Sequence, residues 1–347
     1  MEQITTIGID LAKNVFQVHA VDASEKLVFS KAVKRAAFLP MLLKLPPCLI
    51  GMEACSGAHH WARQLAKAGH TVKLIPPAYV KAYVRRQKND AADAAAICEA
   101  VARPNMRFVP VKAEEQQGLL MLHRTRDLLV SQKTGLINAL RGHLAEFGIV
   151  VAQGVRNVAA LLKVVEDAAD ARLPGIARAA LRPLAAQMQG LGEGIEELDL
   201  KIRQWHESSP VSRALATIPG IGPVTATALV ASITDPTMFK SGRELAAFLG
   251  LVPKQSSSGG KEKLGRISKM GDRYLRKLLV VGASAVLKYA KKEGSASKSW
   301  ASALMETKPF KKVAVALANK TARIAWAILT RGGTYGKPAL AAGAQAI

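Results

Sequence analysis

Residues 3–32 read QITTIGIDLAKNVFQVHAVDASEKLVFSKA, and this stretch decides the fold class. Apolar residues alternate with polar ones in three short runs, which is the two-residue period of a β-strand. The two breaks, at residues 10–14 and 22–25, carry the polar residues that favour turns. The stretch therefore predicts three consecutive strands joined by short turns.

Helical and strand patterns alternate after these strands. We expect helices over residues 35–45, 57–68 and 89–102, with strands over residues 48–52 and 71–75 between them. Strands that alternate with helices are typical of parallel pairing, whereas the opening hairpins pair antiparallel. Residues 1–112 are therefore predicted to form an α/β domain with a mixed sheet.

Residues 113–206 change to a helical period. Leu122, Leu129 and Leu136 recur every seven residues, and a second apolar stripe from Leu184 to Trp205 advances in steps of four and three. This is the spacing of a coiled-coil seam. We predict two antiparallel helices that form an arm, with the turn between residues 148 and 174; an ordinary two-helix hairpin is the alternative.

Residues 207–335 are predicted to form a third, mostly helical domain, and residues 336–347 a tail. The segment IPGIGPVTA at residues 218–226 resembles a helix–hairpin–helix. Between residues 254 and 331, eighteen Lys and Arg stand against four acidic residues, so the positive charge is concentrated here. Such a block predicts a surface that binds nucleic acid.

The composition narrows the class of protein. The 347 residues carry a formal charge of +23, which favours a polyanionic partner. The N-terminus lacks the charged and apolar regions of a signal peptide, and no run of about 18 uninterrupted apolar residues predicts a membrane span. Three cysteines without CxxC spacing indicate neither a disulfide framework nor a zinc site. We expect a cytoplasmic protein with no membrane partner.

Four carboxylates stand where a metal site could form. Asp10 ends the first apolar strand and Glu53 ends another, and strand ends are where α/β sheets place their ligands. Asp90 and Asp93 are three residues apart, which places both on one face of the predicted helix. Oxygen ligands suit hard divalent cations. For Asp90 the alternative is a structural role as the helix cap or in the first turn of the helix, because Asp is common at these positions.

With these residues quoted, the sequence resembles a known family. The segments GIDLAK, MEACSG and KNDAAD, then LINALRGHLAEFGI, IPGIGPVTA and the block from GLVPKQSSSGG to GRISKMGDRYLR, occur in that order along nearly the whole chain. They resemble the insertion-sequence one-ten family of bacterial transposases, which also contains the Piv/MooV-type invertases and RNA-guided bridge recombinases. Within this family they are most similar to the eleven-eleven branch.

The resemblance implies a fold and a reaction. The fold would be an RNase H-like, RuvC-like domain with a DEDD site, a coiled-coil arm and a C-terminal transposase domain. Asp10, Glu53, Asp90 and Asp93 would coordinate magnesium, as two ions, with manganese as the alternative. Ser258 would attack a DNA phosphodiester and become linked to the DNA, and the neighbouring Ser256 and Ser257 leave the register of that serine open.

The resemblance also implies partners. They would be double-stranded DNA of the element ends and the target, and a structured non-coding RNA encoded by the element. The heptad stripe separately favours a dimer through the arm, which we expect to become a tetramer on DNA. We expect phosphate contacts near the hairpin and the serine, from Gly220, Gly222, Lys254, Arg266, Lys269 and Arg273.

Three large aromatic residues are expected to lie in the core: Trp61, Trp300 and Trp326.

Two other functions compete with a transposase. An RNase H-like Holliday-junction resolvase or nuclease would keep the four carboxylates and need no serine. A DNA-binding or RNA-chaperone protein without enzymatic activity would tolerate replacement of all four. The SSSGG segment at residues 256–260, inside a basic domain, favours the transposase.

Overall fold

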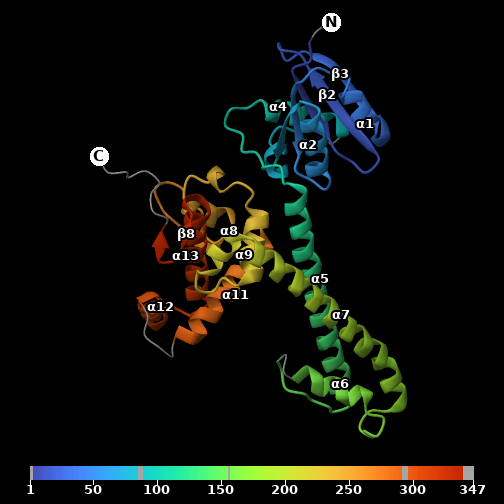
Figure 1. Ribbon diagram of the computed structural model, residues 1–347, viewed down its shortest axis with the longest axis vertical. Coiled ribbons are helices and arrows are strands. Elements are labelled where there is room, and N and C mark those ends of the chain that lie inside the picture. Colours follow the sequence, from blue (N-terminus) through green and yellow to red (C-terminus); the bar gives the residue numbers. More distant parts are fainter. Residues whose placement is uncertain (1–2, 85–88, 155–156, 291–295, 339–347) are drawn as a thin grey trace. The chain divides into compact units, whose positions relative to one another are not determined.

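The computed structural model describes residues 3–84, 89–154, 157–290 and 296–338. The chain divides into two compact units, residues 1–113 and 114–347 (Figure 1). Each unit is described by itself. The expected arm and C-terminal domain fall in one unit, so their separation into two domains stays a prediction, and residues 339–347 of the expected tail lie outside the described residues.

The first unit is built on a five-stranded mixed sheet. Its strands are β1 (Thr6–Asp10), β2 (Val15–Val21), β3 (Leu27–Lys34), β4 (Leu49–Glu53) and β5 (Thr71–Ile75). The order is β3-β2-β1-β4-β5; β1, β2 and β3 pair antiparallel, whereas β4 pairs parallel with both β1 and β5. The predicted mixed α/β class is confirmed.

Four helices accompany the sheet: α1 (Arg35–Leu42), α2 (Ala58–Lys67), α3 (Pro77–Val80) and α4 (Asp90–Val101). The predicted helices correspond to α1, α2 and α4, and the predicted strand at residues 71–75 matches β5. The short helix α3 was not expected. It begins at Pro77, whose fixed φ suits the first turn of a helix, and a single turn has too few residues to show a period.

Helix α4 lies against β1 and β4 at unusually close range. A Cβ added at Gly8 would overlap the backbone of Ala94 and Cys98, and one added at Gly51 would come within 2.7 Å of the Cβ of Val101. Gly8 and Gly51 are paired in the register of β1 with β4, so the two glycines form one flat patch. The alanine-rich sequence of α4 presents few atoms beyond Cβ, which lets the helix sit on this patch.

The opposite face of the sheet holds the larger core. Phe16, Phe38 and Trp61, from β2, α1 and α2, pack edge to face with ring centroids 4.7 to 5.4 Å apart. Edge-to-face contact of this kind adds about 0.5–1.5 kcal/mol per pair to the burial itself. Ile7 and Ile9 of β1 are fully buried in the same cluster. Trp61 is a core residue, as expected.

In the second unit, the helices α5 (Glu114–Ala145) and α7 (Gly175–Ser208) pack as a long antiparallel pair (Figure 1). The direction follows from contacts along the pair: Trp205 donates a hydrogen bond to Glu115, Asp199 pairs with Arg126, and Gly192 lies beside Lys133. Leu122, Leu129 and Leu136 of the predicted stripe are each partly buried. The pair is observed; a coiled coil stays a prediction.

The segment between the paired helices holds a helix that the sequence did not reveal. Residues 148–174 were expected to form a turn, but they include α6 (Val158–Glu166), which packs on α7. The buried guanidinium of Arg178 ties this tip together, since it donates hydrogen bonds to four backbone carbonyls between residues 164 and 173. A nine-residue apolar helix is too short to stand out from loop sequence.

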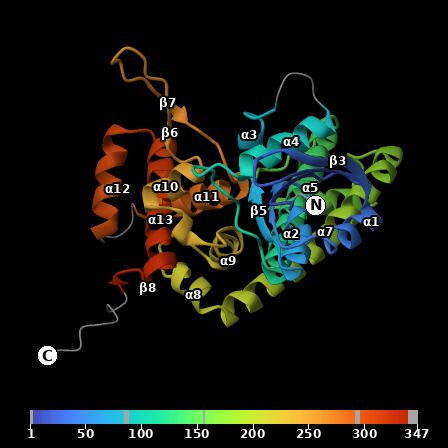
Figure 2. The ribbon, with the colours of Figure 1, turned by 90° about the horizontal axis from the view of Figure 1, so that it is seen from above.

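The remainder of the second unit is helical, as expected, with two small hairpins. The helices are α8 (Pro210–Ala216), α9 (Pro223–Ser232), the 3-10 turn η2 (Pro236–Met238), α10 (Gly242–Phe248), α11 (Arg273–Ala290), α12 (Ala296–Thr307) and α13 (Phe310–Arg331). The hairpins are β6 (Pro253–Gln255) with β7 (Leu264–Ile267), and β8 (Gly333–Thr334) with β9 (Lys337–Pro338). Figure 2 shows β6 and β7 leading into a loop that projects from the neighbouring helices.

Helix α13 is long and apolar enough by composition to cross a membrane, the one such helix among the described residues. One of its faces packs inside the helical core, with Val313, Leu317 and Ile328 buried there. A buried apolar face of this kind is typical of a core helix.

A buried histidine joins three helices of this unit. His123 of α5 is fully buried, 3.1 Å from the hydroxyl of Tyr274 on α11 and 3.0 Å from that of Thr227 on α9. Burial, together with the nearby charge of Arg126, lowers the pKa of His123 to about 4. The folded protein therefore holds a neutral imidazole at a pH where the unfolded chain is already protonated.

We predict that Gly8→Ala destabilises the protein, by about 1–3 kcal/mol, because the new methyl group displaces α4 from β1. Urea unfolding measures the change. Gly118→Ala is the matched control, since Gly118 lies inside α5 with open space around it and alanine favours a helix. Equal stability of Gly8→Ala and wild type would contradict the close packing.

We predict that His123 makes stability fall with acid. Above its unfolded pKa of about 6.5 the residue is neutral in both states; as the pH falls from there to about 4, only the unfolded chain gains the proton. Unfolding free energies across this range should therefore drop about 3 kcal/mol further in wild type than in His123→Gln. Parallel pH profiles for the two proteins would refute the assignment.

Candidate functional site

Two of the predicted carboxylates stand at the ends of neighbouring strands. Asp10 ends β1 and Glu53 ends β4. Side chains of a strand alternate between its faces, so Asp10 shares a face with Gly8, and Glu53 with Gly51. Both glycines face α4, and the same step of two residues leads from each glycine to a carboxylate. The fold therefore directs both acids towards the face that α4 covers.

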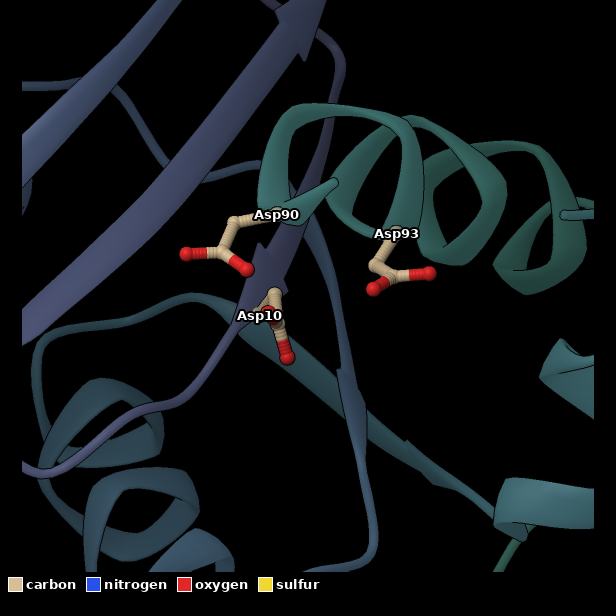
Figure 3. Close-up of side chains that lie close together, drawn as sticks. All are labelled: Asp10, Asp90 and Asp93. Carbon is tan, nitrogen blue, oxygen red and sulfur yellow. The ribbon is translucent and has the colours of Figure 1, made fainter. Parts of the chain in front are cut away.

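The other two carboxylates come from the first turn of α4. Its cap is Asn89, whose side chain accepts a hydrogen bond of 2.7 Å from the backbone N–H of Ala92. Asn89 and not Asp90 is therefore the cap, whereas Asp90 lies in the first turn of α4, which is the other structural role expected for it. Figure 3 shows Asp90 and Asp93 on α4 beside Asp10, and one ligand oxygen from each lies within 4.8 Å of the others.

The cluster is electrostatically crowded. Partial burial raises the pKa of Asp10, and the negative charges of Asp93, Asp90 and Glu53 raise it further. The pKa of the Cys55 thiol is also raised, by burial and then by Glu53 and Asp10, so this cysteine lies at the edge of the cluster. Glu53 thus belongs to the site through its charge, although it is outside the group of three oxygen ligands within 4.8 Å.

This donor set fits a divalent cation. All the ligand atoms are carboxylate oxygens, the ligands preferred by hard cations such as Mg²⁺ and Ca²⁺. Burial and the repulsion between these carboxylates raise the pKa of Asp10. A bound cation would relieve that repulsion. The helix N-terminus beside them does not remove the repulsion.

The predicted serines lie in the hairpin of β6 and β7. Ser258 begins a tight turn, closed by a hydrogen bond of 3.1 Å from the Lys261 N–H to its carbonyl, with Gly259 and Gly260 at φ of +55° and +75°. Two positive φ values in sequence are the requirement of the hairpin turn that glycine pairs favour. Ser258 is exposed, whereas the hydroxyl of Ser257 accepts a hydrogen bond from Gln255.

The predicted nucleic-acid contacts divide into exposed cations and glycines. The side chains of Lys254, Arg266, Lys269 and Arg273 are all exposed, as phosphate contacts require. Gly220 has a structural reason to be glycine, because its φ is +87° and an added Cβ would lie 2.9 Å from the Gly282 carbonyl on α11. Gly222 caps α9 and has open space around it. Phosphate binding at both glycines stays a prediction.

Some exposed residues of the second unit escaped the sequence analysis. Trp300 was expected in the core, but it is 40% exposed, and Lys320 of α13 lies over its ring at 4.9 Å. In a helix as short as α12, the sequence does not show which face an apolar residue occupies. The available signal was the set of cations at residues 311, 312, 320, 323 and 331, but a sequence shows their number and not the face that they share with neighbouring helices.

Comparisons with known proteins agree along the chain. A family profile described as a DEDD transposase matches residues 7–149, and one described as the IS116/IS110/IS902 transposase family matches residues 212–298. A probable family 20 transposase of Pseudomonas aeruginosa is 46% identical over 96% of this chain and 98% of its own length. A putative transposase of Sinorhizobium fredii is 47% identical, covering 96% and 86%. The transposase of the insertion sequence IS1111A of Coxiella burnetii is 39% identical, covering 96% and 92%.

We predict that Asp10→Asn stabilises the protein in EDTA at neutral pH. A carboxylate whose folded pKa is raised destabilises the fold where it is charged, and that cost disappears only as the pH falls through its pKa. Thermal unfolding measures the effect, and adding Mg²⁺ should raise the Tm of wild type more than that of the variant. Glu99→Gln, on the last turns of α4, is the control. A lower Tm for Asp10→Asn in EDTA would contradict the crowding.

Proposed function

The chain belongs to the IS116/IS110/IS902 family of transposases, enzymes that cleave and transfer DNA, and we propose that it does so with the acidic cluster of its first unit and a serine of its second. The observation that supports this most is the convergence of carboxylates from β1 and α4, segments 80 residues apart in the chain, in the part matched by the DEDD profile.

In this proposal Asp10, Glu53, Asp90 and Asp93 hold Mg²⁺, as two ions, with Mn²⁺ as the alternative. When bound, the metal would supply positive charge to the phosphate oxygens and to the attacking and departing oxygens. The residues of the chain do the positioning: the end of β1 fixes Asp10, and the capped first turn of α4 fixes Asp90 and Asp93 on one side. The Gly8 and Gly51 contacts hold these two elements together.

The proposed nucleophile is Ser258. Its hydroxyl oxygen forms a bond to phosphorus while a bond from phosphorus to a deoxyribose oxygen breaks, and the serine proton leaves with that oxygen. Attack by a free deoxyribose hydroxyl on the resulting phosphoserine diester reverses the exchange and joins new ends. A serine hydroxyl is a weak nucleophile unless it is activated. The exposed turn gives Ser258 room to meet such a group outside its own hairpin.

The partners follow from the same proposal. Lys254, Arg266, Lys269 and Arg273 contact the phosphates of duplex DNA, and an RNA encoded by the element guides the choice of site. The first unit is an RNase H-like domain, while α5 and α7 form a coiled-coil arm that joins copies of the chain into a dimer and, on DNA, a tetramer. The segment at residues 218–226 acts as a helix–hairpin–helix, and the protein works in the bacterial cytoplasm.

We predict a covalent protein–DNA adduct when the protein is incubated with Mg²⁺, labelled DNA spanning the element junction, and the element's non-coding RNA. Denaturing gels detect the adduct. Ser258→Ala should abolish it by removing the attacking oxygen, and Asp10→Asn should reduce it by at least about 100-fold, which is the usual effect of losing a group that stabilises developing charge.

Ser256→Ala and Ser257→Ala are the matched controls, since they remove a hydroxyl from the same hairpin and should leave the adduct intact. Loss of the adduct in one of these instead would move the nucleophile to that serine. Cleavage that survives all three serine variants but not Asp10→Asn would replace the proposal with a nuclease or junction resolvase that uses metal alone. A normal adduct in Asp10→Asn would exclude the acidic cluster from the reaction, and binding of DNA without adduct or cleavage, unchanged in Asp10→Asn, would indicate a binding protein.

A further inference from the structure

The second unit contains a groove of about 1480 Å³ that lies apart from the serine turn. Its walls come from α10, the β6–β7 hairpin, α12, α13 and the turn between β8 and β9. The walls fit closely, because Gly242 of α10 packs against the backbone of Arg323 and the Asn319 side chain donates a hydrogen bond to the carbonyl of Leu251. The groove is therefore a built feature of this unit.

One face of α13 forms the floor. Lys312, Ala316, Lys320, Arg323, Ala327 and Arg331 line the groove and follow steps of four, four, three, four and four residues, so they lie on one side of the helix. The opposite side is the apolar face buried in the core. Lys320 and Arg323 are three residues apart on this face, a spacing at which like charges repel one another.

The charge of the groove has a single sign. Lys311, Arg243 and Arg266 add to the four cations on the α13 face, so seven lining residues are Lys or Arg. All seven are exposed, and among the described residues that line the groove there is no Asp or Glu. A ligand for it is therefore an extended polyanion, long enough to reach several of these cations.

Aromatic rings stand beside the cations. Trp300 and Tyr335 line the groove and are 40% and 38% exposed, so their rings can be covered by a ligand. Lys320 lies over the ring of Trp300, and Arg331 over that of Trp326, at 4.9 and 5.7 Å. Trp326 is fixed by a hydrogen bond from its indole N–H to the carbonyl of Pro236.

We propose that this groove binds single-stranded nucleic acid, with phosphates along the cationic face of α13 and unpaired bases stacked on Trp300 and Tyr335. A cationic track beside exposed aromatic rings is the combination that binds single strands, because every unpaired base offers a flat face for stacking. In a duplex the bases are already stacked on one another, so the two rings would go unused. The proposal rests on the proposed function for its class of partner, but it needs neither Ser258 nor the acidic cluster.

Fluorescence anisotropy of the full-length protein in EDTA tests the groove without any metal-dependent cleavage. The probes are labelled single strands of 20 thymidines or 20 uridines and a 20-base-pair duplex. Lys320→Gln/Arg323→Gln removes two groove cations, and Lys288→Gln/Lys308→Gln, two exposed cations that do not line the groove, is its matched control. Trp300→Ala is compared with Tyr289→Ala, which removes an exposed ring from α11.

We expect Lys320→Gln/Arg323→Gln to weaken single-strand binding by about tenfold or more and to reduce the slope of log K against log salt by about 1.4. Trp300→Ala should weaken it by about 5- to 150-fold, the range for one stacked base, and Trp300→Phe should recover most of the loss. Duplex binding should change no more than in the control variants. The thymidine and uridine probes tell whether DNA or RNA is preferred.

Groove variants that bind single strands as their controls do would overturn the proposal, as would an equal loss of duplex binding. Loss of binding to phosphatidylserine vesicles, with single-strand binding unchanged, would assign the groove to a membrane instead. Circular dichroism verifies that each variant is folded. If the wild type forms no covalent adduct but the groove variants lose single-strand binding, the proposed chemistry fails and the groove proposal holds. If the wild type forms the adduct but the groove variants bind single strands as their controls do, only the groove proposal fails.

Discussion

The contact between α4 and the sheet is the constraint on which the first unit depends. Gly8 and Gly51 leave no side chain between the strands and the helix, and Ala94 and Cys98 occupy the space that a Cβ would take. Because side chains alternate along a strand, the same geometry that opens space at these glycines turns Asp10 and Glu53 towards α4. The two-residue spacing from Gly8 to Asp10, and from Gly51 to Glu53, therefore sets both the close helix packing and the direction of the carboxylates.

The second unit solves a different problem, that of carrying a large positive charge on a stable core. Its helices bury apolar faces in two clusters, one at the tip around α6 and one among α8 to α13, and most of their cations are exposed. A few cations are used structurally: Arg178 holds the tip around α6, and Lys277 pairs with Asp127. The cations of the groove have no such acidic partner among the residues that line it.

The sequence predicted the first unit well, because its periods are strong and short. The alternation in residues 3–32 predicted three strands, and the apolar run at residues 71–75 predicted another. The acidic residues at strand ends indicated the acidic cluster. Asn89 rather than Asp90 caps α4, which a sequence cannot decide when both residues suit a cap. The branch of the family, the RNA and the serine came from resemblance, and they remain proposals.

The second unit was harder to predict, since its features depend on which helix face meets which neighbour. Helix α6 and the two hairpins were absent from the sequence analysis because each is shorter than the window in which a period can be seen. The exposure of Trp300 and the single-sign face of α13 emerge only when α10, α12 and α13 are placed together. The cation-rich block at residues 254–331 indicated the class of partner and the region of the chain, but not the helix face that gathers the cations.

The composition of helix α13 has a consequence for the newly synthesised chain. Its composition approaches that of a membrane-spanning segment, and before its apolar face finds the core the nascent helix resembles a candidate for insertion. Lys320 and Arg323 lie near its middle, where each cation costs about 2.5–3.5 kcal/mol in a bilayer. The cations that face the groove in the folded protein therefore also bias the newly made helix away from the membrane.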